Sequence, residues 1–373
     1  MRHSFPLGRL LGVSIRIHWT FILVALWFTW WGRAGDGGGG GWSALAALGL
    51  LAAIFTCVVL HELGHSLVAI RFGARVESIT LLPIGGVAFM RWIPERPVHE
   101  LLMALAGPAV NVLLAMLLWL ARGPLEGPAA WPDSLAGWLD TVMRANLVMA
   151  LFNLVPAFPM DGGRVLRSVL GLLMSHARAT RVAAILGQVM ALVFIVLGWR
   201  LSPMLALIGF FVYMGAGRED RAVQFREALR GLRVRDAMAT PSVALHPGDP
   251  VSRCREMAGP KDPGHFVVEA EGRLVGLVSR ADWTAALKTN GLDTPVETVV
   301  HRHFLALHPD APLARVYEEL GRQRQPLFPV IENGRLVGLL VLSDIERLLA
   351  RRHPVLGSAW EGRIRRPFMV DLG

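Results

Sequence analysis

The chain has 373 residues, of which 53% are hydrophobic and 18% charged, whereas soluble domains carry about a quarter charged residues. The long apolar runs lie within residues 17–217, which excludes a wholly soluble protein and predicts a membrane domain followed by a soluble one. The net charge of +9 is mostly arginine placed between apolar runs, with no interleaved aromatic patch, so we expect anchoring to anionic lipid and no nucleic-acid partner.

Six apolar runs predict about six transmembrane helices after a short basic, amphipathic lead over residues 1–16. The runs span residues 17–31, 42–70, 99–121, 138–157, 182–199 and 204–214, and glycine-rich loops at 36–41 and 122–137 separate some of them. Arginines cluster before the first run, after the second and after the fourth. The positive-inside rule therefore predicts a multi-pass membrane protein with both termini in the cytoplasm.

The second run contains the stretch Leu60-His61-Glu62-Leu63-Gly64-His65. On a helix, His61 and His65 project from one face and can hold one zinc ion, and Glu62 can take a proton from a water that the metal activates. Ionisable groups are costly in hydrocarbon, which favours a functional role over a pair of core histidines. Cys57 lies one turn earlier and is either a further ligand or, more in keeping with its residue type, a buried filler.

Residues 76–90 are too short to cross a membrane as a helix. Their β-branched residues, with Pro83 and Gly85-Gly86 between them, predict two short strands. A β-hairpin re-entering the membrane must have its backbone covered or solvated, and an exposed strand edge there could pair with an extended peptide. The alternative is a surface hairpin without a special role.

Two histidines leave a catalytic zinc site one protein ligand short. Asp161 ends the fourth run at a matching depth, between two prolines and two glycines, and is either the third ligand or the N-cap of the next helix. Asn153 lies two turns deeper and could bind the substrate backbone or a developing oxyanion, or could join two helices. Asn111 is a weaker candidate of the same kind.

These residues resemble the site-2 protease family of intramembrane zinc metalloproteases over residues 1–217. The similarity rests on HELGH, PIGGV, AGPAVN and NLVPAFPMDGG in that order. It implies one zinc ion held by His61, His65 and Asp161, with Glu62 as general base. It also implies a substrate-positioning or oxyanion role for Asn153, and substrate near Gly85 and Gly86.

The soluble half contains an internal repeat, in which each copy has a β-hairpin leading into a helix. The repeat resembles a tandem pair of CBS domains. Such pairs often bind an adenine nucleotide, and here the matching residues are Ser279, Asp282 and Asp344. Val341 stands where the second copy would have the hydroxyl of Ser279, which weakens that site. We expect a Pro/Gly-rich interruption at 259–264 to distort the helix of the first copy. The alternative is a structural or homodimerising pair without a ligand.

The fold class predicted is therefore a polytopic α-helical membrane protein with a re-entrant β-hairpin, plus a soluble α/β CBS pair. We expect a protease domain at 1–220, a linker at 221–232, CBS repeats at 233–290 and 291–350, and a basic tail at 351–373. The predicted function is hydrolysis of membrane-protein substrates in or near their transmembrane segments, regulators of membrane-bound transcription factors among them. The alternatives are a CBS-regulated transporter or channel, or an inactive relative that binds membrane clients. The richness in Ala, Arg, Gly and Leu suggests a bacterial source.

Overall fold

A computed structural model describes most of the chain. The described residues are 4–34, 44–83, 85–90, 96–123, 135–239, 244–258, 264–271, 273–320, 325 and 327–352. The glycine loop at 36–41, most of the loop at 122–137 and of the interruption at 259–264, and nearly all of the tail at 351–373 lie outside them. The chain divides into two compact units, Met1–Val223 and Gln224–Gly373.

The first unit is mainly helical. Its helices are α1 (Phe21–Ala34), α2 (Ala44–Arg71), α3 (Pro97–Arg122), α4 (Leu135–Asn153), α5 (Asp161–Leu170), α6 (His176–Leu201) and α7 (Pro203–Ala228). Within the described residues, α2, α3, α4 and α6 are long and apolar enough to cross a membrane. The polytopic membrane fold is thereby confirmed, while the further spans expected at α1 and α7 stay predictions. The predicted linker at 221–232 begins inside α7.

A four-stranded sheet accompanies these helices, in the order β1-β2-β3-β4. Its strands are β1 (Ser4–Leu10), β2 (Val13–His18), β3 (Val76–Leu82) and β4 (Gly85–Met90). The two strands predicted within residues 76–90 are confirmed. Residues 1–16 were expected to form a short basic, amphipathic lead, for which no strand was predicted; residues 4–16 belong to an antiparallel hairpin whose β2 pairs in parallel with β3. The alternation of Val13, Ile15 and Ile17 with polar residues is the strand signal that was missed.

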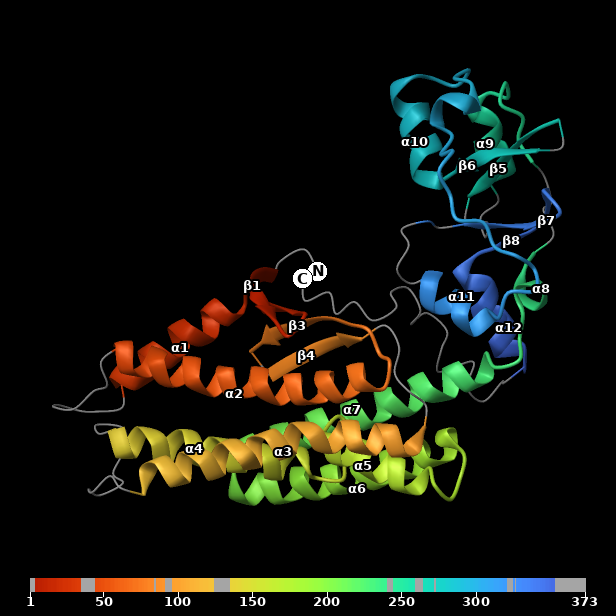
Figure 1. The fold of residues 1–373 in the computed structure, drawn as a ribbon. Coiled ribbons are helices and arrows are strands. Elements are labelled where there is room, and N and C mark those ends of the chain that lie inside the picture. Colours follow the sequence, from red (N-terminus) through yellow and green to blue (C-terminus); the bar gives the residue numbers. More distant parts are fainter. Residues whose placement is uncertain are drawn as a thin grey trace. The chain divides into compact units, whose positions relative to one another are not determined.

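Helix α2 lies between the sheet and α3 (Figure 1). On the sheet side, Leu63 packs with Val13 and Ile79 in a small buried cluster. On the other side, the backbones approach closely, because a β-carbon on Gly64 would lie 2.9 Å from the carbonyl oxygen of Ala106 on α3. The histidine-bearing turns of α2 are therefore covered on both sides.

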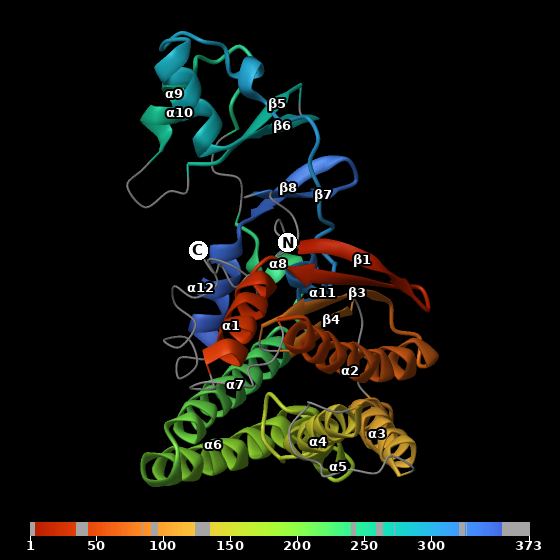
Figure 2. The ribbon, with the colours of Figure 1, turned by 90° about the vertical axis from the view of Figure 1, so that its left-hand side faces the viewer.

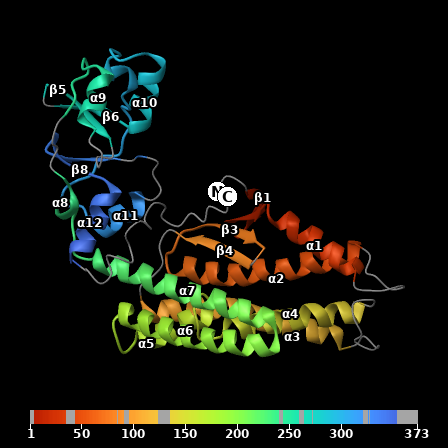
Figure 3. The same ribbon diagram turned by 180° about the vertical axis from the view of Figure 1, so that it is seen from behind.

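The chain between α4 and α5 is short and tightly packed. Helix α4 ends at Asn153 and not at residue 157 as predicted, since Pro156 has no backbone N–H to continue the helix. Gly162 and Gly163 lie against the backbone of residues 154–158, where any β-carbon would overlap it. Helices α6 and α7 run side by side (Figure 3), and Ala191 and Val212 from them enclose Ala157 of this segment.

The second unit contains two copies of one motif (Figure 2). Its elements are α8 (Val234–Ala237), α9 (Val251–Met257), β5 (Phe266–Ala270), β6 (Arg273–Val278), α10 (Arg280–Thr289), η1 (Val296–Val299), α11 (Leu313–Leu320), β7 (Phe328–Glu332), β8 (Arg335–Leu340) and α12 (Leu342–Arg352). Hairpins β5–β6 and β7–β8 have the same register and a bulge at the same place. The predicted internal repeat is thus a repeat of structure.

Each copy of the motif completes its core with a short helix that lies next to the other copy in the sequence. Val234 and Ala237 of α8 belong to the core built by α11, α12 and the β7–β8 hairpin. Val296 of η1 belongs to the core of α9, α10 and the β5–β6 hairpin. A third apolar cluster, containing Leu277 and Leu327, joins the two copies. The copies therefore interlock and form a single folded body.

Candidate metal centre

Three side chains from α2 and α5 converge on one point inside the first unit. His65 Nε2 lies 3.1 Å from both His61 Nε2 and Asp161 Oδ2, and His61 Nε2 lies 3.3 Å from Asp161 Oδ2. All three side chains are buried. Among the described residues they form a group able to hold a metal ion. The structure thus brings together the three residues that the sequence singled out as ligands.

The outer nitrogen of each imidazole is held by α3. His61 Nδ1 lies 2.7 Å from Asn111 Oδ1, and His65 Nδ1 lies 2.6 Å from the backbone oxygen of Met103. Both oxygens accept hydrogen bonds, so each Nδ1 carries a proton, and in the neutral imidazole each Nε2 then presents a lone pair. Metal-ligating histidines commonly have their second ring nitrogen bonded in this way.

The donor set fits zinc. Two imidazole nitrogens and a carboxylate oxygen face one another, an arrangement that a bound cation would stabilise. Their separations of 3.1–3.3 Å are close to the roughly 3.3–3.5 Å expected between the ligands of a tetrahedral ion bound at about 2.0–2.2 Å. Asp161 is the first residue of α5, and the preceding Met160 occupies the N-cap position without a side-chain cap, so Asp161 does not serve as the N-cap.

Gly107 makes room for the two imidazoles. A β-carbon on Gly107 would overlap the His65 ring and would lie 2.7 Å from His61 Cε1. Met103, Gly107 and Asn111 follow one another at four-residue spacing, so they share the face of α3 that meets the histidines. The role of Gly107 was not predicted, although the AGPAVN motif contained both it and Asn111.

Glu62 points toward the sheet. A β-carbon on Gly86, in the second position of β4, would lie 2.5 Å from Glu62 Cγ and 3.3 Å from Oε1. Glu62 is half-buried, and its carboxylate makes no hydrogen bond within the described part of the chain. Strand β4 is an edge strand of the sheet that the described residues form, so Glu62 adjoins an edge strand.

Asn153 and Cys57 differ in their surroundings. Asn153 ends α4, is half-buried and has no hydrogen-bond partner for its side chain among the described residues, so it does not join two helices there. Cys57 lies in an apolar cluster with Leu50 and Val142, outside the group of possible metal ligands. Cys57 is free, as is Cys254.

An ion-pair cluster anchors α5, the helix that begins with Asp161. Arg167 of α5 pairs with the buried Glu100 of α3 and, at 2.6 Å, with Glu219 of α7, and its guanidinium lies 5.0 Å from the centre of the Phe158 ring. Arg167 and Glu100 are each at most 5% exposed. The pairing thus fixes α5 against α3 at a point two turns from Asp161.

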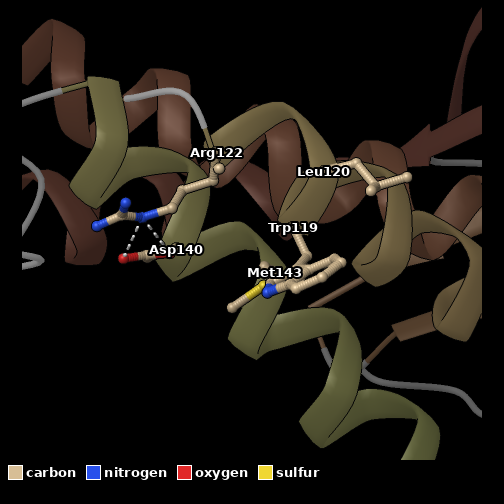
Figure 4. A pocket seen from close by; sticks show the side chains of 6 residues that line it. Trp119, Leu120, Arg122, Asp140 and Met143 are labelled. Carbon is tan, nitrogen blue, oxygen red and sulfur yellow. Dashed lines mark hydrogen bonds and ion pairs between the residues drawn. The ribbon is translucent and has the colours of Figure 1, made fainter. Parts of the chain in front are cut away.

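A surface pocket at the other end of α3 is remote from this centre. Figure 4 shows Trp119, Arg122, Asp140 and Met143 around it, with Arg122 Nε 3.4 Å from Asp140 Oδ1. Arg122 follows Gly107 by fifteen residues, or about 22 Å along a helix. The pocket therefore takes no part in the geometry around the histidines.

In the second unit, the predicted nucleotide residues are engaged at helix starts. Ser279 caps α10, and its hydroxyl contacts the Asp282 carboxylate, which also lies 2.9 Å from His301 Nε2. Burial opposes ionisation of Asp282, but these hydrogen bonds outweigh burial and lower its pKa. In the second copy, Asp344 accepts a hydrogen bond from the Val341 backbone and pairs with Arg347. Only the first copy offers a hydroxyl at this position.

Two family models match the chain. Peptidase family M50 matches residues 49–127 and 129–197, and the CBS domain matches residues 234–289 and 296–351. The first match contains all three converging residues and Glu62. The second falls on the two copies of the repeat.

Two curated relatives align with this chain over nearly their whole length. The zinc metalloprotease MJ0392 of Methanocaldococcus jannaschii is 31% identical over 356 residues, which cover 94% of this chain and 97% of that protein. The putative zinc metalloprotease Rip3 of Mycobacterium tuberculosis is 32% identical over 381 aligned positions, covering 94% and 93%. The solved structure of a site-2 protease from Methanocaldococcus jannaschii is 36% identical over 58% of this chain and 95% of that one, with a TM-score of 0.44.

Proposed function

The chain belongs to peptidase family M50, the site-2 proteases, and carries a tandem CBS pair; from this membership we propose that His61, His65 and Asp161 hold a catalytic zinc ion with Glu62 as the general base. The protein is an intramembrane zinc metalloprotease. The transporter alternative finds no support among the relatives. The observation that carries the residue assignment is the convergence of three buried ligand atoms beside the Glu62 carboxylate, which has no hydrogen-bond partner among the described residues.

The chain's own residues supply proton transfer and orientation. A bound zinc ion would polarise the scissile carbonyl and lower the pKa of the attacking water. Glu62 accepts the proton of that water and passes it to the nitrogen of the departing amine. The Asn153 side chain, which has no hydrogen-bond partner among the described residues, donates a hydrogen bond to the substrate backbone or to the oxygen on which negative charge develops.

We propose that the substrate binds as an extended segment along the free edge of β4. A helical transmembrane segment has its backbone hydrogen bonds satisfied internally, so it must unwind before its carbonyl can reach Glu62. Gly86 supports this because its missing side chain lets the strand lie against Glu62. We expect faster cleavage of a model segment with Gly or Pro near the cut site than of a poly-Leu segment. Equal rates would contradict strand addition.

The zinc assignment is tested on the purified full-length chain. We expect about one zinc per chain in the wild type and loss of both zinc and cleavage in His65→Ala. A wild type without zinc, or a His65→Ala variant that keeps it, would contradict the assignment. Both termini are proposed to be cytoplasmic, which reporter fusions at each end would check.

We propose that the first CBS copy binds an adenine nucleotide at Ser279 and Asp282. The hydroxyl at the start of α10 suits a phosphate, and the partly exposed Asp282 suits a ribose. Titration of the full chain with AMP and ATP should give binding that Asp282→Ala abolishes. Binding that is unchanged in that variant would contradict this site, and homodimerisation through the pair would then be the remaining proposed role.

A further inference from the structure

The metal centre is connected to a chain of buried amides that reaches across three helices. Asn111 Nδ2 on α3 donates to Asn146 Oδ1 on α4 at 3.2 Å. Asn146 Nδ2 donates in turn to the backbone oxygen of Val142 at 2.9 Å and to Cys57 Sγ on α2 at 3.2 Å. Asn111 and Asn146 are both completely buried. No sequence feature had pointed to Asn146.

The Val142 carbonyl fixes which atom donates and which accepts in each hydrogen bond between these amides. The carbonyl of Val142 only accepts hydrogen bonds, so the Asn146 amide nitrogen must face it and the Asn146 oxygen must face Asn111. Asn111 then turns its own oxygen toward His61. A backbone carbonyl on α4 therefore dictates, through two amides, that His61 donates a hydrogen bond from Nδ1, which leaves Nε2 as the nitrogen that would hold a metal ion.

We propose that Asn146 is a positioning residue, which acts through Asn111 to hold His61 in the metal-binding tautomer and orientation. This inference rests on the proposed zinc site. It also assigns Cys57 a role as an acceptor at the end of the amide chain, in place of a metal ligand. His65 has no such chain, because its Nδ1 is held directly by the Met103 backbone.

An alternative is that Asn146 only joins α4 to its neighbours, as polar side chains commonly do between membrane helices. Two variants separate these roles. Asn146→Leu removes every hydrogen bond of the side chain. Asn146→Ser keeps a donor for the Val142 carbonyl, four residues earlier, but is too short to reach Asn111. A structural role predicts that Ser is tolerated, whereas the positioning role predicts that both variants weaken zinc binding.

The experiment measures zinc affinity of the full-length protein by competition with a chelator. Outer partners of ligating histidines are worth about 10–100-fold in metal affinity, and we expect losses of that size for Asn111→Leu and for both Asn146 variants. The double variant Asn111→Leu/Asn146→Leu should lose no more than Asn111→Leu alone, because Asn146 acts through Asn111. The absorption spectrum of the cobalt-loaded protein should shift in all of them.

Asp140→Asn is the matched control, since Asp140 is a buried polar residue of the same helix that pairs with Arg122 and not with the amide chain. It should leave zinc affinity and the cobalt spectrum unchanged. Wild-type affinity in Asn146→Ser, or losses in the double variant that equal the product of the single losses, would overturn the positioning role. A wild type that binds no zinc would instead overturn the proposed function.

Discussion

The two units differ in how many of their polar side chains are buried. Among the described residues, every buried polar or charged side chain except Asp344 lies in the first unit. Several of these meet at the histidine centre or in the Arg167 cluster. In the second unit, Ser279 and Asp282 lie at the start of α10 and are only partly buried. Burial of a polar side chain thus indicates a functional or structural cluster in the membrane-spanning unit. In the second unit, helix capping explains the polar residues at helix starts as well as ligand binding does.

Among these variants, removal of a proposed zinc ligand from the first unit should have the largest effect, on both zinc affinity and cleavage. Asp161→Ala deletes a carboxylate on which both histidines converge. We expect zinc affinity to fall by more than the roughly 100-fold that limits changes outside the ligand set, and cleavage to disappear. Metal analysis of the purified variant checks this. Retention of stoichiometric zinc would show that Asp161 is not a ligand.

Breaking the buried ion-pair cluster should mainly affect stability. Arg167→Leu leaves Glu100 buried without its principal partner, which typically costs about 3–5 kcal/mol. Thermal unfolding in detergent should show the loss, and Arg167→Leu/Glu100→Gln should recover part of it. If the single variant unfolds like the wild type, α5 is anchored by other contacts.

Crowding the histidines should have an intermediate effect. A methyl group at Gly107 would overlap both imidazoles, and overpacking of this kind costs about 1–3 kcal/mol. We expect Gly107→Ala to weaken zinc retention. Gly123→Ala is the matched control at the end of the same helix, where a β-carbon meets nothing within 3.5 Å. Equal zinc retention in the two variants would show that the histidines accommodate the methyl group without loss of zinc binding.

The smallest effect is expected in the second unit. The pKa of Asp282 is lowered in the folded state, so its ionised form stabilises the start of α10 above the unfolded pKa of about 3.9, and that contribution is lost as pH falls through the folded value. Hydrogen exchange of α10 should differ between wild type and Asp282→Asn at pH 6, by about 1 kcal/mol or less, and the difference should shrink at pH 3. An equal difference at both pH values would rule out ionisation as the cause.

The three proposed ligands could be singled out from the sequence because their signal is local. The spacing of His61 and His65 is set by one helical turn, and Asp161 stands beside helix-breaking prolines and glycines. Asn146 and Gly107 could not, because their roles depend on which face of α3 meets α2 and α4. Strand β2 was missed for a related reason: its partner β3 lies about sixty residues later in the chain.

The most direct test compares cleavage and zinc content in wild type, Glu62→Gln and the control Glu227→Gln, an exposed carboxylate on α7. Glu62 contacts the edge strand and not the three ligand atoms, so Glu62→Gln should retain zinc while cleavage of a co-expressed membrane substrate falls by about 10²–10⁴-fold, the range for loss of a general base. The control should match the wild type. Undiminished cleavage in Glu62→Gln would contradict a zinc protease that uses Glu62 as its base.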